Sequence, residues 1–297
     1  MLERVCDLAV RFAGTEIEES RIESLPLIED DDLIALLHRA SNEMLAPLVE
    51  FILKKGRPTS KLEQTKNYVS HHPNHQMYVN EIVAEIQRYG ANDIVSFFRG
   101  GNGVRYSEIV RDVAKKHGVK NLTYRTEKLE TEIIETIFWD SYAEMTAEQR
   151  MEVLRSLKVR NLRGAWRPLS LVGFHAVVGA AGFSAYQMTV IVANGMAQAL
   201  LGHGLSFVTN WTLVKSVSLL AGPPGLAFAA FLTANMVAGP AYRVTIPCVI
   251  QVAAIRQHLE HERRLLELER RRRLIRLMVG FLIGVALVSL AFFLLKR

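Results

Sequence analysis

Residues 261–276 read HERRLLELERRRRLIR, and residues 277–295, directly after them, read LMVGFLIGVALVSLAFFLL. The second stretch has 19 positions without a charged or an amide side chain. A helix of that length would be about 28 Å long, close to the ~30 Å hydrocarbon core of a bilayer. A helix also satisfies its own backbone N–H and C=O groups, as lipid requires. The pattern therefore predicts a C-terminal transmembrane helix over residues 277–295, in preference to a buried core helix.

Arginines gather on only one side of this apolar stretch. Seven precede it, whereas only Lys296 and Arg297 follow it. Because positively charged flanks stay in the cytoplasm, we expect a single-pass C-terminal anchor in the bacterial inner membrane and a cytoplasmic body. Anionic headgroups would attract these arginines by ~1 kcal/mol each near the surface, and nearby glutamates would pair with some of them. The seven are Arg263, Arg264, Arg270, Arg271, Arg272, Arg273 and Arg276.

Composition restricts the class of protein. The 297-residue chain is 49% apolar and 22% charged, with a mean hydropathy of +0.13, so it is not disordered. Cys6 and Cys248 are too few for a disulfide framework or a cysteine-based zinc site. Residues 1–167 hold 24 basic and 26 acidic side chains, against 12 and 4 in residues 168–297. A nucleic-acid binder would spread its basic residues over a folded face, so we expect a lipid membrane as partner and no nucleic acid.

Apolar residues recur at helical spacing in the first half of the chain. Three such stripes lie within residues 79–89, 106–117 and 129–138, and Gly90 and Gly118 are placed to end the first two helices. Alternating strand patterns with hairpin turns are absent. We predict an all-α protein, a helical bundle with a Gly-rich apolar helical region and the C-terminal transmembrane helix.

Residues that favour helix starts support this division. Asp30, Asp31 and Asp32 before one apolar stretch and Ser41 before the next are expected N-cap signals. Thr146-Ala-Glu-Gln149 is typical of a capping box that opens a helix ending near residue 164. The expected parts are an N-terminal extension (1–29), a cytoplasmic helical domain (30–167), an apolar Gly-rich helical region (168–258), a basic juxtamembrane helix (259–276) and the anchor (277–295).

The Gly-rich region is open to two interpretations. It has 47 residues without a formal charge before Lys215 and 27 more before Arg243, and Gly222-Pro-Pro-Gly225 must interrupt any helix. Its helices are either buried in the body through close Gly and Ala contacts, or residues 168–242 enter the bilayer as a hairpin that turns near Asn194-Gly195. Its polar side chains would need partners inside lipid, which favours burial slightly.

Histidines provide the nearest approach to a metal site. His71-His-Pro-Asn-His75 contains three, but His71 and His72 point in different directions unless the loop folds tightly, so we favour a solvated loop. His258 and His261 are three residues apart on a helix, with no third ligand nearby. We therefore expect no metal and no cofactor.

Four residues are candidates for a function of another kind. Arg99 and Arg105 flank Gly100-Gly-Asn-Gly103, which is either an anion-binding nest or, as we favour, a connection between helices. His203 lies between two glycines, where a packed core histidine is the usual case. Arg243 is a lone charge between apolar runs, and must be paired if buried or reach headgroups if interfacial.

Several stretches carry a resemblance to a known family. In their order they resemble the YaaW-like family of uncharacterised bacterial proteins over roughly residues 30–256, with LGHG and RVTIP as its more specific motifs. Residues 80–120 are also similar to the ubiquinol–cytochrome c chaperone domain, a helical, non-catalytic assembly-factor module. The family implies no catalytic residues, and its shorter, soluble-looking pattern lacks residues 1–29 and the anchor. The stretches are DDDLIALLHRASNEMLAPLVEFIL (30–53), RYGANDIVSFFRGGNGVRYSEIVRDVAKKHGVK (88–120), FWDSYAEMTAEQRMEVL (138–154) and GPAYRVTIPCVIQVAAIR (239–256).

Three classes of function are compatible with these features. The Walker, HExxH, GxSxG and CxxC motifs are missing, so we expect no enzyme and no catalytic residues. The preferred expectation is a scaffold or chaperone-like factor that binds protein clients at the membrane, with homo-oligomers allowed. The alternatives are a membrane-perturbing stress or defence effector that inserts residues 168–242, and an enzyme that uses the histidines or Arg243.

Overall fold

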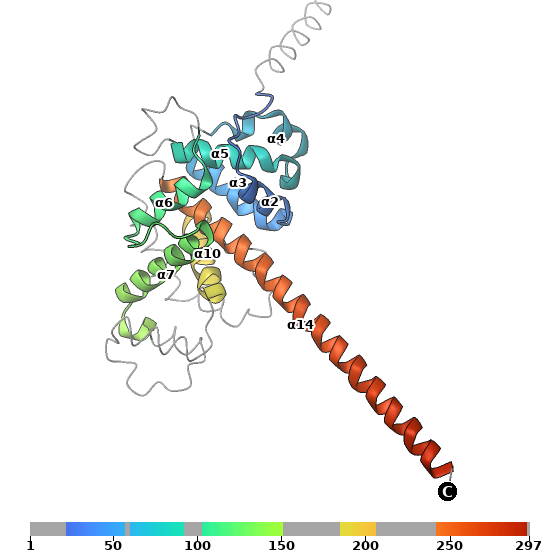
Figure 1. The fold of residues 1–297 in the computed structure, drawn as a ribbon. Helices are drawn as coiled ribbons and strands as arrows, with labels where there is room; N and C mark the ends of the chain where they lie inside the picture. Colours follow the sequence, from blue (N-terminus) through green and yellow to red (C-terminus); the bar gives the residue numbers. More distant parts are fainter. Residues whose placement is uncertain (1–21, 57–59, 92–102, 151–184, 206–241, 296–297) are drawn as a thin grey trace, which may run out of the picture. The chain divides into compact units, whose positions relative to one another are not determined.

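The computed structural model describes residues 22–56, 60–91, 103–150, 185–205 and 242–295. Every regular element in these ranges is helical, and one isolated bridge joins Ile22 and Thr65. The prediction of an all-α protein is confirmed for this part of the chain. Its α-helices are α2 (Asp31–His38), α3 (Asn42–Gly56), α4 (Lys66–His71), α5 (Val79–Ala91), α6 (Tyr106–Lys116), α7 (Thr126–Glu144), α10 (Ala185–Leu201) and α14 (Tyr242–Leu295), with short 3-10 helices η1 (Leu62–Gln64) and η2 (His75–Tyr78) (Figure 1).

The chain forms two compact units, Met1–Ile255 and Arg256–Arg297, here called unit 1 and unit 2. Unit 1 holds the core, in which α5 contacts α2, α3 and α6. The apolar stripe of α5 is buried, as its helical spacing predicted. Its Gln87 is also buried, and its side-chain amide bonds the backbone of Ile28 in both directions at 2.9 Å. This pair fixes the segment before α2 against α5.

Gly90 does not end α5, contrary to the prediction, because the helix continues to Ala91. A Cβ atom at Gly90 would lie 2.4 Å from the Ile109 side chain. The residue therefore allows close contact between α5 and α6. Gly118 does follow α6 as predicted: its φ is 73°, and its N–H donates to the Lys115 carbonyl at 3.1 Å. Only a residue without a Cβ adopts that conformation at little cost.

The predicted caps are confirmed in part. The Met44 N–H lies 3.4 Å from Ser41 Oγ, and the Thr146–Gln149 capping box forms in both directions at 2.8 and 3.3 Å. The rest of that helix, beyond residue 150, lies outside the described residues. Asp30 makes no side-chain cap bond to α2; its carboxylate instead accepts the Tyr106 N–H at 2.6 Å and caps α6.

The described part of the Gly-rich region is helical and largely buried. α10 contacts α7 and α3, and the segment of α14 that belongs to unit 1 is buried from Val244 to Ile255. The turn near Asn194-Gly195, which belonged to the alternative of a membrane hairpin, does not form, because both residues lie inside the continuous helix α10. Packing on several sides compensates for the low helix propensity of a glycine there. Residues 168–184 and 206–241 lie outside the described residues.

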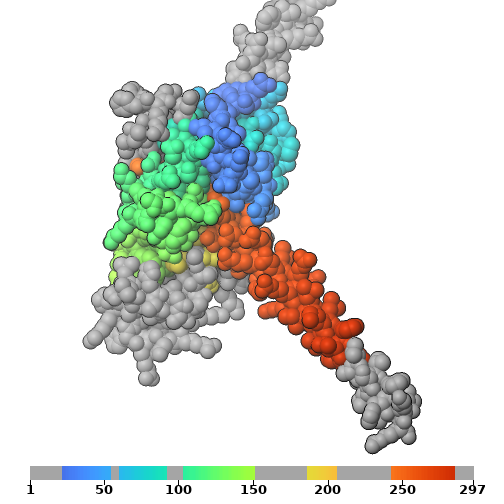
Figure 2. All heavy atoms as spheres, viewed as in Figure 1, coloured from blue at the N-terminus to red at the C-terminus, as the bar shows by residue number. Residues whose placement is uncertain are grey.

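Unit 2 is the remainder of α14. Its side chains are exposed from Glu262 to Gly284, and Figure 2 shows them along the orange part of the helix. Within the described residues, no helix combines the length and apolar character needed to cross a membrane. The predicted anchor lies in α14, but the side chains of its residues 285–295 are not described.

Candidate functional site

The predicted candidates fall into separate places, of which the turn around His203 is the most constrained. Gly202 ends α10 with a φ of 84°, and its N–H donates to the Gln198 carbonyl at 3.1 Å. A Cβ atom on Gly204 would lie 2.6 Å from Asn194 Oδ1, which accepts the Leu205 N–H at 2.9 Å. The LGHG motif thus forms a turn that favours glycine at two positions. Gly202 has a left-handed backbone, and Gly204 has no space for a Cβ atom beside Asn194.

This turn directs His203 outward, so the expectation of a packed core histidine is wrong. The side chain is 56% exposed, and its Nε2 lies 3.2 Å from Glu50 Oε2 on α3. Lys54 Nζ lies 3.3 Å from the same carboxylate oxygen and also donates to the Leu201 carbonyl at 3.3 Å. The cluster Glu50–Lys54–His203 joins α3 to the end of α10. Exposed ion pairs of this kind stabilise a fold only weakly.

The histidine-rich loop folds more tightly than a solvated loop would. His72 is exposed but His75 is buried, and their Nδ1 atoms lie 3.2 and 2.5 Å from the same atom, Tyr78 Oη. His71 points elsewhere, with its Nδ1 3.0 Å from the Asn67 carbonyl. Sequence reasoning missed Tyr78. Its position three residues after His75, at one helical turn, was the available signal.

Burial tunes the groups around Tyr78. It raises the pKa of the Tyr78 phenol, and the neighbouring Tyr68 raises it further. Burial also lowers the pKa of His75, as does His72, while Glu50 acts in the opposite direction. At neutral pH these effects favour a protonated phenol beside a neutral imidazole.

The other candidates do not join a shared site in the described residues. Arg105 and Arg243 are exposed, the latter in the first turn of α14, so Arg243 is not a buried arginine. Arg99 and most of the Gly100–Gly103 stretch lie outside the described residues. His258 Nε2 lies 3.3 Å from Glu262. The described residues contain no group of three or more His, Cys, Asp or Glu side chains suited to a metal ion.

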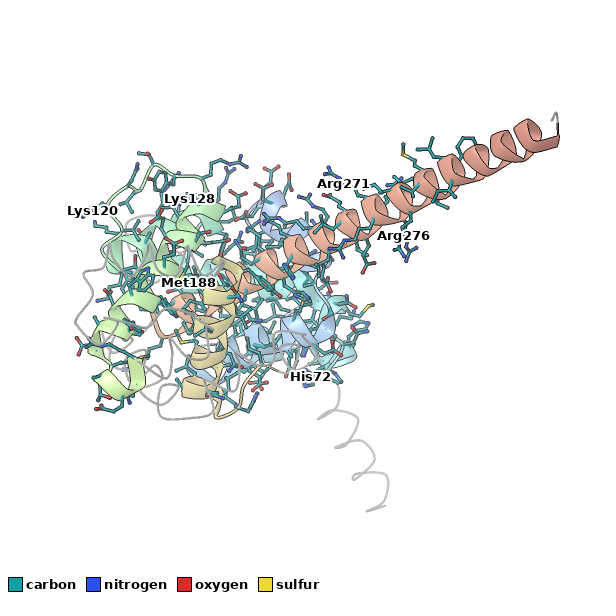
Figure 3. All side chains as sticks on the ribbon, turned by 90° about the horizontal axis from the view of Figure 1, so that it is seen from below. His72, Lys120, Lys128, Met188, Arg271 and Arg276 are labelled. Carbon is teal, nitrogen blue, oxygen red and sulfur yellow. The ribbon has the colours of Figure 1, made fainter. Side chains whose placement is uncertain are left out.

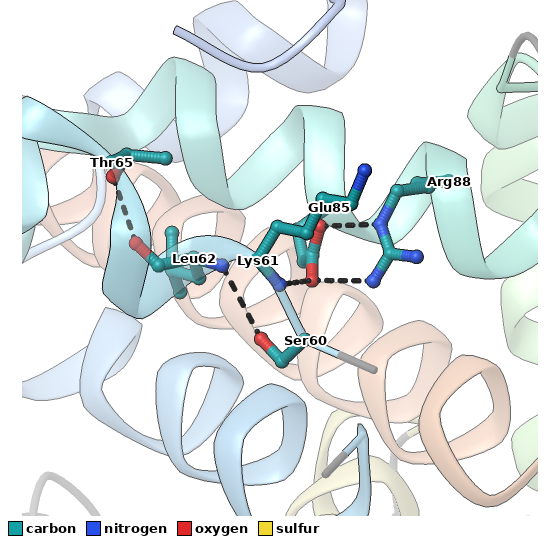
Figure 4. Close-up of polar contacts among 6 residues, drawn as sticks. All are labelled: Ser60, Lys61, Leu62, Thr65, Glu85 and Arg88. Carbon is teal, nitrogen blue, oxygen red and sulfur yellow. Dashed lines mark hydrogen bonds and ion pairs between the residues drawn. The ribbon is translucent and has the colours of Figure 1, made fainter. Parts of the chain in front are cut away.

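A buried ion pair not predicted from the sequence lies within α5, beside the segment before η1. The Glu85 side chain is fully buried and binds Arg88 through two bonds of 2.7 and 2.8 Å (Figure 4). The same carboxylate accepts the Lys61 N–H at 2.8 Å. The bond to Glu85 raises the pKa of Arg88. This pair fixes backbone and is structural; its only sequence signal was the i, i+3 spacing of opposite charges.

The predicted arginines lie on unit 2, in one continuous helix. Arg264 lies 3.3 Å from Glu260, and Arg263 lies 3.9 Å from Glu267. No ion pair forms at the four arginines 270–273 within the described residues.

These arginines surround α14. Successive residues of an α-helix are rotated by about 100°, so positions 270–273 and 276 leave no wide sector of the helix without an arginine. In Figure 3 the side chains of Arg271 and Arg276 extend to opposite sides of the helix. The five residues Arg270, Arg271, Arg272, Arg273 and Arg276 are here called the arginine ring. Large exposed apolar side chains follow immediately, with exposures of 54 to 72% at Leu274, Ile275, Leu277, Met278, Phe281, Leu282 and Ile283 among others.

Comparison with known proteins identifies relatives along most of the chain. No family model and no solved structure matches it. A UPF0174 protein of Helicobacter pylori strain J99 is 34% identical over 247 residues, which cover 81% of this chain and 97% of the relative. A second protein of that strain is 31% identical over 207 residues, covering 68% and 99%. UPF0174 protein YaaW of Escherichia coli K12 is 28% identical over 239 residues, covering 77% and 95%. Because two relatives above 30% identity are matched over nearly their full length, this chain belongs to the UPF0174, or YaaW-like, family.

Proposed function

We propose that this protein is a non-enzymatic helical protein anchored in the bacterial inner membrane by residues 277–295. Unit 1 faces the cytoplasm, and binds protein clients there as a scaffold or chaperone-like factor. The observation that carries the proposal is the arginine ring, which has no ion pair within the described residues and directly precedes exposed apolar side chains.

The distribution of charge around α14 supports a helix that passes through the headgroup layer. A helix lying flat on a membrane has one apolar face and one polar face. The arginine ring instead presents guanidinium groups in every direction, as a helix surrounded by headgroups requires. Anionic lipid attracts each arginine by about 1 kcal/mol near the surface.

The paired arginines earlier in α14 fit a segment in water. Arg263 and Arg264 lie near glutamates one helical turn away, at positions where such pairs form on solvated helices. A helical segment in water before the arginine ring is what a cytoplasmic body joined to an anchor requires.

The scaffold role is supported by the resemblance of residues 80–120 to a non-catalytic assembly-factor domain. The competing effector role requires residues 168–242 to insert into lipid, but the described part of this region, α10, contacts α3 and α7 in unit 1. Burial of α10 favours the scaffold. Overproduction should therefore leave the membrane potential of cells intact; rapid depolarisation that depends on residues 168–242 would support the effector instead.

A topology experiment tests the anchor. The full-length protein carries a short epitope after Arg297, and intact spheroplasts are treated with protease. We expect loss of the C-terminal epitope, protection of unit 1, and retention of the protein in membranes washed with carbonate. A protected epitope, or extraction of the protein by carbonate, would contradict the proposal.

Charge reversal tests the arginine ring. The variant with Arg270–Arg273 changed to Glu is expected to lose the fixed orientation, so that the epitope becomes protected in part of the molecules. Arg263→Glu with Arg264→Glu is the matched control, because those residues lie near glutamates in the same helix. Equal behaviour of the two variants would rule out a specific role for the ring.

A further inference from the structure

The loop between α4 and α5 brings three potential metal ligands to one point. His72 Nδ1 and His75 Nδ1 lie 3.2 and 2.5 Å from Tyr78 Oη. Imidazole nitrogen and phenolate oxygen both bind transition-metal ions. The three groups come from within seven residues, at the end of α4 and in η2.

Neighbouring contacts hold these groups in place. Tyr68 stacks on His72 with ring centroids 4.7 Å apart, and meets Tyr78 edge-on at 5.4 Å. Asn42 accepts the His75 N–H at 2.6 Å and donates to the Pro73 carbonyl at 3.0 Å. The loop is therefore fixed through both its backbone and its rings, as a metal site with few ligands requires.

Hydrogen bonding among the three groups fixes where their protons lie. A phenol has one proton, so it can donate to only one of the two Nδ1 atoms. The other imidazole must then carry its own proton on Nδ1 and donate to the phenol oxygen. A metal cation in place of the phenol proton would be bound by lone pairs of all three groups at once.

The separations are close to those of a ligand set. Metal–nitrogen and metal–oxygen bonds of about 2.0–2.2 Å place neighbouring ligand atoms about 2.9–3.4 Å apart. The contact of His72 with Tyr78, at 3.2 Å, already has that length. The contact of His75, at 2.5 Å, must lengthen by several tenths of an ångström. His72 is exposed and is the side from which an ion and a water ligand can enter.

We propose that His72 Nδ1, His75 Nδ1 and the phenolate oxygen of Tyr78 bind one divalent transition-metal ion, such as Zn²⁺ or Cu²⁺. Binding replaces the phenol proton by the metal and releases that proton to solvent. The imidazole that carried its proton on Nδ1 exchanges with solvent to the tautomer protonated on Nε2, so both imidazoles stay neutral and both Nδ1 lone pairs are free for the metal. Solvent water completes the coordination.

The loss of the phenol proton predicts how the metal affinity depends on pH. Since one proton leaves as the metal binds, the affinity should rise about tenfold per pH unit around neutral pH.

The test uses the full-length protein in detergent, purified without a polyhistidine tag and treated with a chelator. Cu²⁺ is added, and the visible charge-transfer band of a copper-bound tyrosinate is recorded; Zn²⁺ affinity is measured by competition with a chromophoric chelator. We expect one equivalent of tightly bound metal and a tyrosinate band. Absence of that band from the wild-type protein would overturn the proposal.

Three variants identify the ligands. Tyr78→Phe should remove the band, and His72→Gln should weaken Zn²⁺ binding at least about tenfold. His71→Gln is the matched control, because its ring points to the Asn67 carbonyl, away from the cluster. Equal affinities of His72→Gln and His71→Gln would overturn the proposal, and His72 is exposed, so this comparison remains decisive if Tyr78→Phe does not fold.

Discussion

Arginines occur in two contrasting environments in this protein, beside a buried carboxylate in unit 1 and around an exposed helix in unit 2. Arg88 is held by two bonds to the fully buried Glu85. Arg270–Arg273 form no ion pair within the described residues, on a helix whose side chains are exposed. The same guanidinium group therefore fixes the fold in one region and is available to an external partner in the other. Which of these two roles an arginine has is decided by its burial and its partner, not by the residue type.

Breaking the buried pair should have the largest effect on stability. Glu85→Gln leaves the Arg88 charge in a largely buried place and removes the ionic acceptor of the Lys61 N–H, so we expect the free energy of unfolding to fall by about 3–5 kcal/mol. Denaturant unfolding of the protein in detergent measures it. The control Glu267→Gln, in a pair whose side chains are 68% and 62% exposed, should cost less than about 0.5 kcal/mol. Similar losses in both variants would remove the contrast between the units.

Acid should destabilise unit 1 through His117. Burial lowers the pKa of this histidine to about 4, and its Nε2 has no hydrogen-bond partner among the described residues. The unfolded chain, with a pKa near 6.5, then binds the proton more readily. The free energy of unfolding should be constant for this group above pH ~6.5 and fall by up to about 1.4 kcal/mol per unit as the pH drops toward 4.

The variant His117→Phe isolates that contribution. It keeps a flat ring but cannot take up a proton, so the steep part of the acid dependence should disappear from its unfolding curves between pH 4 and 6.5. An unchanged slope would show that other groups control the acid sensitivity of unit 1.

Glycine substitutions extend the comparison of the two units. Gly204→Ala places a Cβ atom 2.6 Å from Asn194 Oδ1 and disturbs the bond to Leu205 N–H, at an expected cost of about 1–2 kcal/mol. His203 should also move away from Glu50. Gly280→Ala on α14 meets no atom within 4 Å and should be neutral or favour the helix by up to about 1 kcal/mol. A loss of stability in Gly280→Ala would indicate a close partner of α14.

The smallest effect is expected for an ion pair in unit 2. Glu260→Gln removes the partner of Arg264, whose side chain is 70% exposed. On a solvated helix such a pair contributes about 0.3–0.5 kcal/mol and is weakened by salt. Helix content measured by circular dichroism at low and high salt should differ only slightly between the variant and the wild type. A large change would mean that this part of α14 is not in water.

Local patterns were sufficient to predict much of the fold. The stripes of α5, α6 and α7, the left-handed Gly118 and the Thr146–Gln149 capping box depend on residues within a few positions of one another, so periodicity and turn chemistry reveal them. Predictions that depended on contacts between distant segments were less successful. Asn194-Gly195 lies inside a helix because contacts with α3 and α7 outweigh a weak local signal for a turn.

The candidate sites could not be predicted from local patterns either. His203 depends on Glu50, 153 residues away, and no local pattern connects them. Tyr78 was overlooked because a phenol next to two histidines is recognisable only when the loop brings both Nδ1 atoms to its oxygen.

Helix type, caps, the charge gradient and family membership follow from the order of the residues, because each depends on neighbours along the chain or on direct comparison of sequences. The partners of Glu50, Glu85 and Tyr78, and the burial of α10, depend on the folded arrangement of unit 1. Except for the contacts of Tyr78 with His72 and His75 inside one loop, such contacts join segments that are distant in sequence. Their free energy comes from shape, desolvation and pairing that form only when the helices come together.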